Sequence, residues 1–270
     1  MSAMSAMTPF LVAASLSPSC HGPGRIVPWL FVLGMLVMVP IGARVASADG
    51  PVASPAEKAA AADKVDRHPE LKRLSKTEEV WVDKDRKEVV VGAKVVLDDG
   101  PIEVFACLEN TKEHEAVIAA RSTARLVHAA LLAVGLDPGK PVSFDPEYRP
   151  ARGPVVRVML RWRDADGKQH EVRAQEWIRN SQTGKPLDSD WVFAGSVFWK
   201  DPQGGDEYYQ ADGGDLICVS NFPTATLDLP IQSSQSNELL LFEVFNGRVP
   251  PKGTVVDIVL SAAPAKPASN

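Results

Sequence analysis

Apolar and polar positions alternate in short runs through most of residues 76–261, a pattern that indicates β-strands. The clearest run places apolar side chains on one strand face and arginines on the other: Val156, Val158, Leu160 and Trp162 against Arg157, Arg161 and Arg163. Because Asp- and Gly-rich turns separate the runs, we expect three hairpins, pairing 80–82 with 89–91, 95–97 with 102–108, and 155–163 with 170–174. Later strands are expected at 191–198, 208–211, 216–220, 239–245 and 254–260.

Residues 114–136 have helical periodicity instead. Asn110 and Glu113 are spaced as a capping pair before this stretch, and Gly135 can end it. A restart near Ser122 would divide it into two helices. We therefore expect an α+β fold, with a mainly antiparallel β-sheet or sandwich and one or two helices over about residues 114–136 packed on it.

The N-terminal 48 residues contain no acidic side chain and carry the features of a signal peptide. Arg25 precedes an apolar run over residues 26–41, and small residues lead up to Ala48. We expect cleavage after Ala48 and export to the periplasm or the medium. An uncleaved N-terminal membrane anchor is the alternative, although the apolar run of about 16 residues is shorter than the roughly 20 of a spanning helix.

Removal of residues 1–48 takes away two of 29 basic residues and none of 34 acidic ones, leaving a net charge of −7. That charge argues against a nucleic-acid partner, and no stable membrane span remains after cleavage. Residues 49–75 are poor in large apolar side chains, so we expect a flexible linker. Residues 76–261 then form one globular domain, and residues 262–270 a disordered tail.

The densest group of reactive side chains lies in residues 107–115. Glu113, His114 and Glu115, with His128 further along, are candidates for acid–base catalysis, and His114, Glu115 and His128 are candidate metal ligands. No metal-binding spacing such as HExxH supports this interpretation. In the alternative, Glu113 caps a helix and His114 only bonds a neighbouring strand.

Four residues are candidates for ligand binding: Trp191, Ser196, Trp199 and Tyr208. Tryptophan in strands either fills the core or presents its ring to a ligand, and core filling is favoured for Trp191. Exposed rings on one sheet face would indicate a glycan-binding domain. The arginine face of residues 157–163 either attracts an anion or pairs with acidic loops.

Cys107 and Cys218 remain after cleavage, each within an apolar run. Export permits a disulfide between them, and two buried free thiols on neighbouring strands are the alternative. Cysteine clusters, a P-loop and a GxGxxG motif do not occur in the sequence, so an iron–sulfur cluster or a bound nucleotide has no basis; any other cofactor stays unknown.

Several short motifs together resemble the YdjY-domain family over about residues 76–261. They are Gly100–Glu103, Thr111–Glu115, Val127–Leu132 with Gly135 and Pro138–Gly139, Ala174–Ile178, Trp191–Ser196 and Pro250–Thr254. The resemblance is closest to the planctomycete branch and implies an exported bacterial protein with one domain. It supplies no catalytic residues, because the family has no established substrate or mechanism.

The sequence therefore favours an exported, non-enzymatic binding or cell-envelope-associated module. The alternatives are a metal-dependent hydrolase that uses the segment Lys112–Glu115, and a tryptophan-lined glycan-binding domain.

Overall fold

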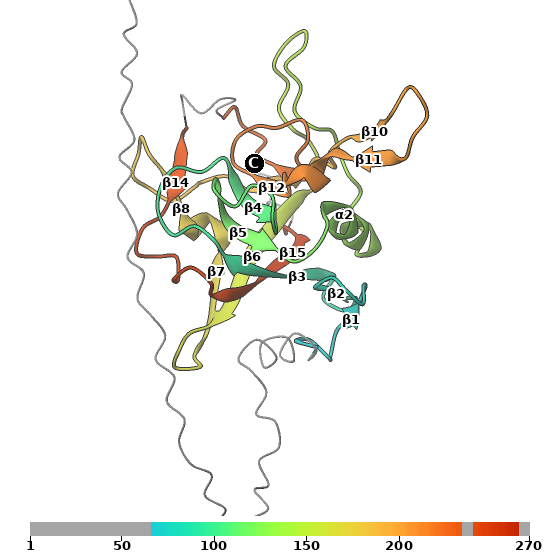
Figure 1. The fold of residues 1–270 in the computed structure, drawn as a ribbon. Helices are drawn as coiled ribbons and strands as arrows, with labels where there is room; N and C mark the ends of the chain where they lie inside the picture. Colours follow the sequence, from blue (N-terminus) through green and yellow to red (C-terminus); the bar gives the residue numbers. More distant parts are fainter. Residues whose placement is uncertain (1–65, 234–239, 265–270) are drawn as a thin grey trace, which may run out of the picture. The chain divides into compact units, whose positions relative to one another are not determined.

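A computed structural model describes residues 66–233 and 240–264, and these residues are rich in β-structure (Figure 1). The predicted signal peptide, residues 49–65 of the predicted linker and residues 265–270 of the predicted tail lie outside the described residues. The strands are β1 (Lys72–Arg73), β2 (Val80–Asp83), β3 (Glu88–Val95), β4 (Val104–Leu108), β5 (Ala116–Ala120), β6 (Val155–Arg163), β7 (Gln169–Arg173), β8 (Ile178–Asn180), β9 (Trp191–Phe193), β10 (Phe198–Lys200), β11 (Glu207–Tyr209), β12 (Ile217–Cys218), β13 (Leu227–Asp228), β14 (Phe242–Val244) and β15 (Val255–Ala262). Helix α2 spans Ala124–Ala133, and short 3-10 helices η1 and η2 span Ala174–Trp177 and Gln210–Gly213.

Eight of the described strands close into a barrel. Their order is β3–β15–β6–β9–β13–β12–β4–β5, and β5 pairs back with β3. Neighbours are antiparallel except in the pairs β4–β5 and β12–β13. The expected sandwich is therefore wrong in its finer detail, although the fold is mostly β as predicted. Closure pairs both edges of the sheet, which a sandwich would leave open.

The longest strands, β3, β15 and β6, lie side by side and alternate between two environments. Ile258 of β15 pairs with Val91 of β3 and Leu160 of β6, and all three are fully buried in the main core. The next residue, Val259, pairs with Val90 and Met159 on the outer face. Alternation thus gives this sheet an inner row that fills the core and an outer row available to other parts of the chain.

Two of the three expected hairpins are confirmed, β2 with β3 and β6 with β7. The hairpin expected between residues 95–97 and 102–108 is wrong, because β5 lies between β3 and β4 in the sheet. Gly100 has a positive φ of 98°, and Pro101 forms a bridge with Glu243 instead of continuing a hairpin.

Helix α2 is the one α-helix within the described residues, and the helix expected over 114–136 is wrong for residues 114–123. The predicted local contact does form, since the Asn110 amide donates to Glu113 Oε1 at 3.0 Å. The chain then enters β5, whose five residues are all buried. Thr123 caps α2 by accepting from the Leu126 amide at 3.3 Å, and Gly135 follows the helix with a φ of 88°. The apolar face of α2 joins the main core.

The described part of the expected linker, residues 66–75, contacts the outer face of the sheet. Strand β1 pairs with β2, and the Trp81 indole donates to Asp66 Oδ1 at 2.8 Å. The guanidinium of Arg73 lies 5.4 Å from the centre of the Trp81 ring. Trp81 is fully buried as a result, in a small outer cluster with Val90 and Val259. No helix in the described residues is long and apolar enough to cross a bilayer.

Candidate functional site

The Lys112–Glu115 segment forms a loop between β4 and β5, and its side chains diverge. Glu113 caps the turn and lies 3.7 Å from Lys94 Nζ. The His114 side chain is 80 % exposed, with its Nε2 atom 3.9 Å from Glu115. His114 is therefore outside any enclosed cleft, where an acid–base or metal-binding imidazole would be expected.

Lys112 is the centre of this loop's interactions. Its ammonium lies 2.9 Å from Asp215, 3.3 Å from Glu115 and 4.7 Å from the centre of the Phe222 ring. Burial disfavours the ammonium, but the hydrogen bond and charge of Asp215 outweigh it and raise the pKa of Lys112. Burial, together with the charge of Glu115, raises the pKa of Glu103 beside it. A nucleophilic lysine needs a neutral amine, whereas the raised pKa of Lys112 favours the ammonium. This environment suits a residue that holds neighbouring loops together.

His128 lies on α2 and is buried against the barrel, whereas His114 is exposed. Its Nδ1 atom shares a 2.9 Å hydrogen bond with Tyr209 Oη, and its ring packs edge-on against Phe193 and Phe198. Burial lowers the pKa of His128. In the described ranges, no group of three or more His, Cys, Asp or Glu side chains is placed to hold a metal ion. The structure therefore does not bring the candidates His114, Glu115 and His128 together.

Trp191 and Ser196 occupy structural positions. Trp191 is fully buried, and its indole donates to the Cys218 carbonyl at 2.8 Å. Ser196 adopts a φ of 54°; its hydroxyl donates to the Thr224 carbonyl at 2.6 Å and accepts from the Ala211 amide at 3.1 Å. Both residues hold strands and loops together.

Cys107 and Cys218 lie on the neighbouring strands β4 and β12, in one small buried cluster. Both are free thiols, so the disulfide considered from the sequence is not formed. Burial raises the pKa of Cys107 to about 12 and that of Cys218 well above its usual range. Neither thiol is activated, because nucleophilic cysteines need a lowered pKa.

Trp199 and Tyr208 lie together on an exposed hairpin. Strands β10 and β11 form a two-stranded sheet that extends away from the barrel, with Trp199 paired to Tyr208 and Phe198 to Tyr209 (Figure 1). Paired residues share a face, so Trp199 and Tyr208 are neighbours on one side. Their side chains are 47 % and 46 % exposed, whereas Tyr209 is buried.

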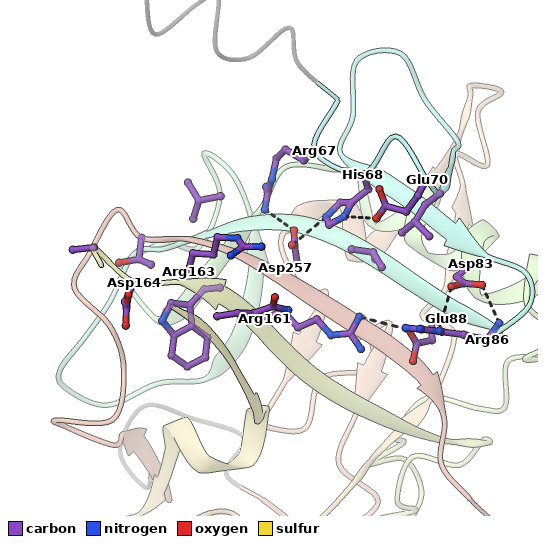
Figure 2. Close-up of a pocket in the computed structure, with 17 residues that line it drawn as sticks. Arg67, His68, Glu70, Asp83, Arg86, Glu88, Arg161, Arg163, Asp164 and Asp257 are labelled. Carbon is purple, nitrogen blue, oxygen red and sulfur yellow. Dashed lines mark hydrogen bonds and ion pairs between the residues drawn. The ribbon is translucent and has the colours of Figure 1, made fainter. Parts of the chain in front are cut away.

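A groove of about 920 Å³ runs over the outer face of β3, β15 and β6 (Figure 2). We call it the charged groove; the residues that define it here are Arg67, His68, Arg86, Arg161, Arg163 and Asp257. Asp257, on the central strand β15, accepts from Arg67 at 2.5 Å and lies 3.1 Å from His68 Nε2. That hydrogen bond is the main reason why the pKa of His68 is raised, against the effect of burial.

Arg67 reaches a second carboxylate, that of Glu79 at 2.8 Å, and Glu79 also pairs with Arg121 at 3.1 Å. The Glu79 side chain passes over β3 at Gly92. A Cβ added at Gly92 would lie 1.9 Å from Glu79 Oε2. Only glycine leaves room for this crossing. Arg67, in the wall of the charged groove, is thus held by ion pairs to Asp257 on β15 and to Glu79, the residue before β2.

The sequence pattern predicted some residues of the charged groove but not the others. The arginine face of β6 was visible as alternation, and Arg161 and Arg163 lie in the groove (Figure 2). Arg67, His68 and Asp257 gave no local signal, because His68 and Asp257 are 189 positions apart. His68 also fell in a segment whose composition indicated a linker.

The family model of the YdjY domain matches residues 80–261. No curated protein matches the chain, and no solved structure does. Because the matched residues make up more than half of the sequence and reach into all eight strands of the barrel, the chain belongs to the YdjY-domain family.

Proposed function

We propose that this protein is an exported, non-enzymatic binding module of the cell envelope that binds glycan chains through the β10–β11 hairpin. The observation that carries the proposal is the pair Trp199 and Tyr208, adjacent on one face of an exposed hairpin. Aromatic rings bury large apolar areas at low entropic cost, which suits the CH-rich face of a sugar ring.

Polar groups beside the rings complete a surface for sugar hydroxyls. A hollow next to Tyr208 is lined by Arg125, Phe198, Asp206 and Glu207. The carboxylates accept hydrogen bonds and the guanidinium donates them. Aromatic rings beside a few placed polar groups are a common composition of a ligand site.

The base of the hairpin is held rigidly, which lowers the entropic cost of binding. Tyr209 Oη donates to the Gly195 carbonyl at 3.1 Å and contacts Thr226 Oγ1 at 3.1 Å. Phe198 packs against the rings of His128 and Tyr209. The two exposed rings are therefore presented from a fixed support.

Export is part of the same proposal and is supported by the sequence of residues 1–48, with Arg25, the apolar run and the small residues before Ala48. A non-enzymatic role is supported by the separation of the candidate acid–base groups: His114 is exposed on a loop, and His128 is buried against Tyr209.

The test is a pull-down of the chain beginning at residue 49 with insoluble peptidoglycan, chitin and cellulose, followed by titration with soluble oligosaccharides using tryptophan fluorescence. Trp199→Ala and Tyr208→Ala should each weaken binding about tenfold, as expected for the loss of one aromatic contact of ~1–1.5 kcal/mol. Val255→Ala removes an exposed apolar side chain elsewhere and should leave binding unchanged. The proposal would be contradicted if Trp199→Ala and Tyr208→Ala bound the glycans as well as the control Val255→Ala. It would also be contradicted if the parent chain bound none of the glycans.

A further inference from the structure

The charged groove is a second surface, separate from the aromatic hairpin, and it shares no lining residue with β10 or β11. Its floor is the outer face of β3, β15 and β6, and its walls are residues 67–71 and the β6–β7 turn (Figure 2). The hairpin proposal makes no use of these side chains.

Several carboxylates of the charged groove already have strong partners. Asp257 accepts from Arg67 at 2.5 Å and contacts His68 at 3.1 Å. Asp164 lies 2.6 Å from His170 Nε2. Each of these two carboxylates therefore already has a hydrogen-bond partner within the protein.

Arg161 and Arg163 of β6 have longer or fewer contacts than these carboxylates. Within the described residues, Arg163 makes one hydrogen bond, to the Gly167 carbonyl at 3.2 Å. Arg161 lies 3.4 Å from Glu171 and 3.6 Å from Glu88, longer than the 2.7–2.9 Å typical of strong charge-assisted bonds. Each guanidinium has five N–H donors, so most of them have no close acceptor.

Arg161 and Arg163 are two positions apart on one strand, so their side chains leave the same face about 7 Å apart. Arg86 adds a third guanidinium at the far end; it is 70 % exposed and lies 3.9 Å from Asp83. Each of these two guanidinium groups on one strand face has spare donors in the fork geometry that recognises a carboxylate.

We propose that the charged groove binds an extended peptide by holding one of its carboxylates between Arg161 and Arg163. The floor also offers apolar contacts, from exposed Val255 and from Leu71 at the wall. Glu70 and Glu88 on the lining repel a polyanion, which disfavours nucleic acid or a phosphate-rich chain. The carboxylate belongs to an acidic side chain or to a free C-terminus, because both present the same two oxygens.

The test uses fluorescence anisotropy with a fluorescein-labelled hexapeptide of alternating valine and serine in which one central residue is glutamate, added to the chain beginning at residue 49. Two further peptides separate the sources of the carboxylate. One has an amidated C-terminus, and the other has glutamine in place of glutamate. Inorganic phosphate at matched ionic strength serves as a competitor.

We expect saturable binding that Arg161→Ala and Arg163→Ala each weaken about tenfold. Arg157→Ala is the matched control, since Arg157 lies on the same strand and face but does not line the groove, and binding should change less than about twofold. Thermal unfolding of each variant shows that the fold persists. Arg163→Lys should recover part of the affinity, because the charge remains and the fork is lost.

Loss of binding with one of the two altered peptides identifies the carboxylate and supports the proposal. Equal weakening by Arg157→Ala, displacement by phosphate at the peptide's own concentration, or absence of binding to all three peptides would overturn it. Trp199→Ala should leave peptide binding intact, so failure of this proposal and failure of the glycan proposal are distinguishable.

Discussion

Asp228 is a buried carboxyl group whose replacement tests the electrostatics of the barrel directly. Its side chain is fully buried on β13, next to β9. Oδ1 accepts from the Leu229 amide at 2.8 Å and from Asn221 Nδ2 at 3.3 Å, while Oδ2 has no hydrogen-bond partner among the described residues. Burial raises the pKa of Asp228 from 3.8 to about 8 despite the two hydrogen bonds.

This shift has a definite sign for stability. Between pH 3.8 and about 8 the folded chain retains the Asp228 proton, whereas the unfolded chain has lost it. The folded state therefore binds more protons, and the free energy of unfolding falls as the pH rises. One pKa unit corresponds to about 1.4 kcal/mol, so this group costs about 3 kcal/mol of stability between pH 5 and pH 7.

Asp228→Asn keeps the shape and the accepting Oδ1 but cannot ionise. We expect the wild-type free energy of unfolding, measured by urea denaturation, to fall relative to that of Asp228→Asn by about 3 kcal/mol from pH 5 to pH 7. Asp85→Asn, at an exposed position, is the control and should track the wild type. Parallel curves for the wild type and Asp228→Asn over this range would refute the assignment of a proton to Asp228.

Substitutions at three further positions test contacts described above, each by urea denaturation at pH 7. Gly92→Ala should cost about 1–3 kcal/mol and displace Glu79, because the new Cβ would lie 1.9 Å from its carboxylate; an unchanged midpoint would contradict this crossing. Lys112→Met should cost about 2 kcal/mol by leaving the Asp215 carboxylate without its cation, and Lys112→Arg should restore most of that stability. Trp191→Phe should cost about 2 kcal/mol through a lost indole hydrogen bond and a small cavity, and a neutral result would show that the bond contributes little.

Strand pairs joined by short turns were predictable because their signal is local. The β6–β7 hairpin shows this: alternation defines both strands, and Asp164 accepts from the backbone amides of Asp166 and Lys168 in the turn. The same alternation revealed the arginine face of β6, of which Arg161 and Arg163 line the charged groove. Family membership was also readable, because the motifs are contiguous in sequence.

The helix expected at residues 114–123 failed for a tertiary reason. Asn110 and Glu113 make the local contact that starts many helices, and the alanines that follow have helical propensity. Yet β5 is inserted between β3 and β4, where every one of its residues is buried. The alanines of β5 fit between two neighbouring strands because they are small. The local sequence gives no information about those neighbouring strands.

Barrel closure and the walls of the charged groove were beyond local reasoning as well. Closure depends on β3 meeting β5, and the groove depends on His68 meeting Asp257 across 189 positions. Polar residues in a segment of linker-like composition give no sign that they will dock. The pairing of such charged residues with distant ones can be seen only in the folded structure.

The docked segment Asp66–Leu71 also bears on where this protein can be trimmed. A truncated chain that starts at residue 80, the first residue of the family match, lacks both Asp66 and the β1 strand. Its Trp81 indole would lose its acceptor and meet water, and Asp257 would lose Arg67 and His68 together. Recombinant versions meant to behave as the intact protein should therefore begin upstream of Asp66, well before the conserved-domain boundary.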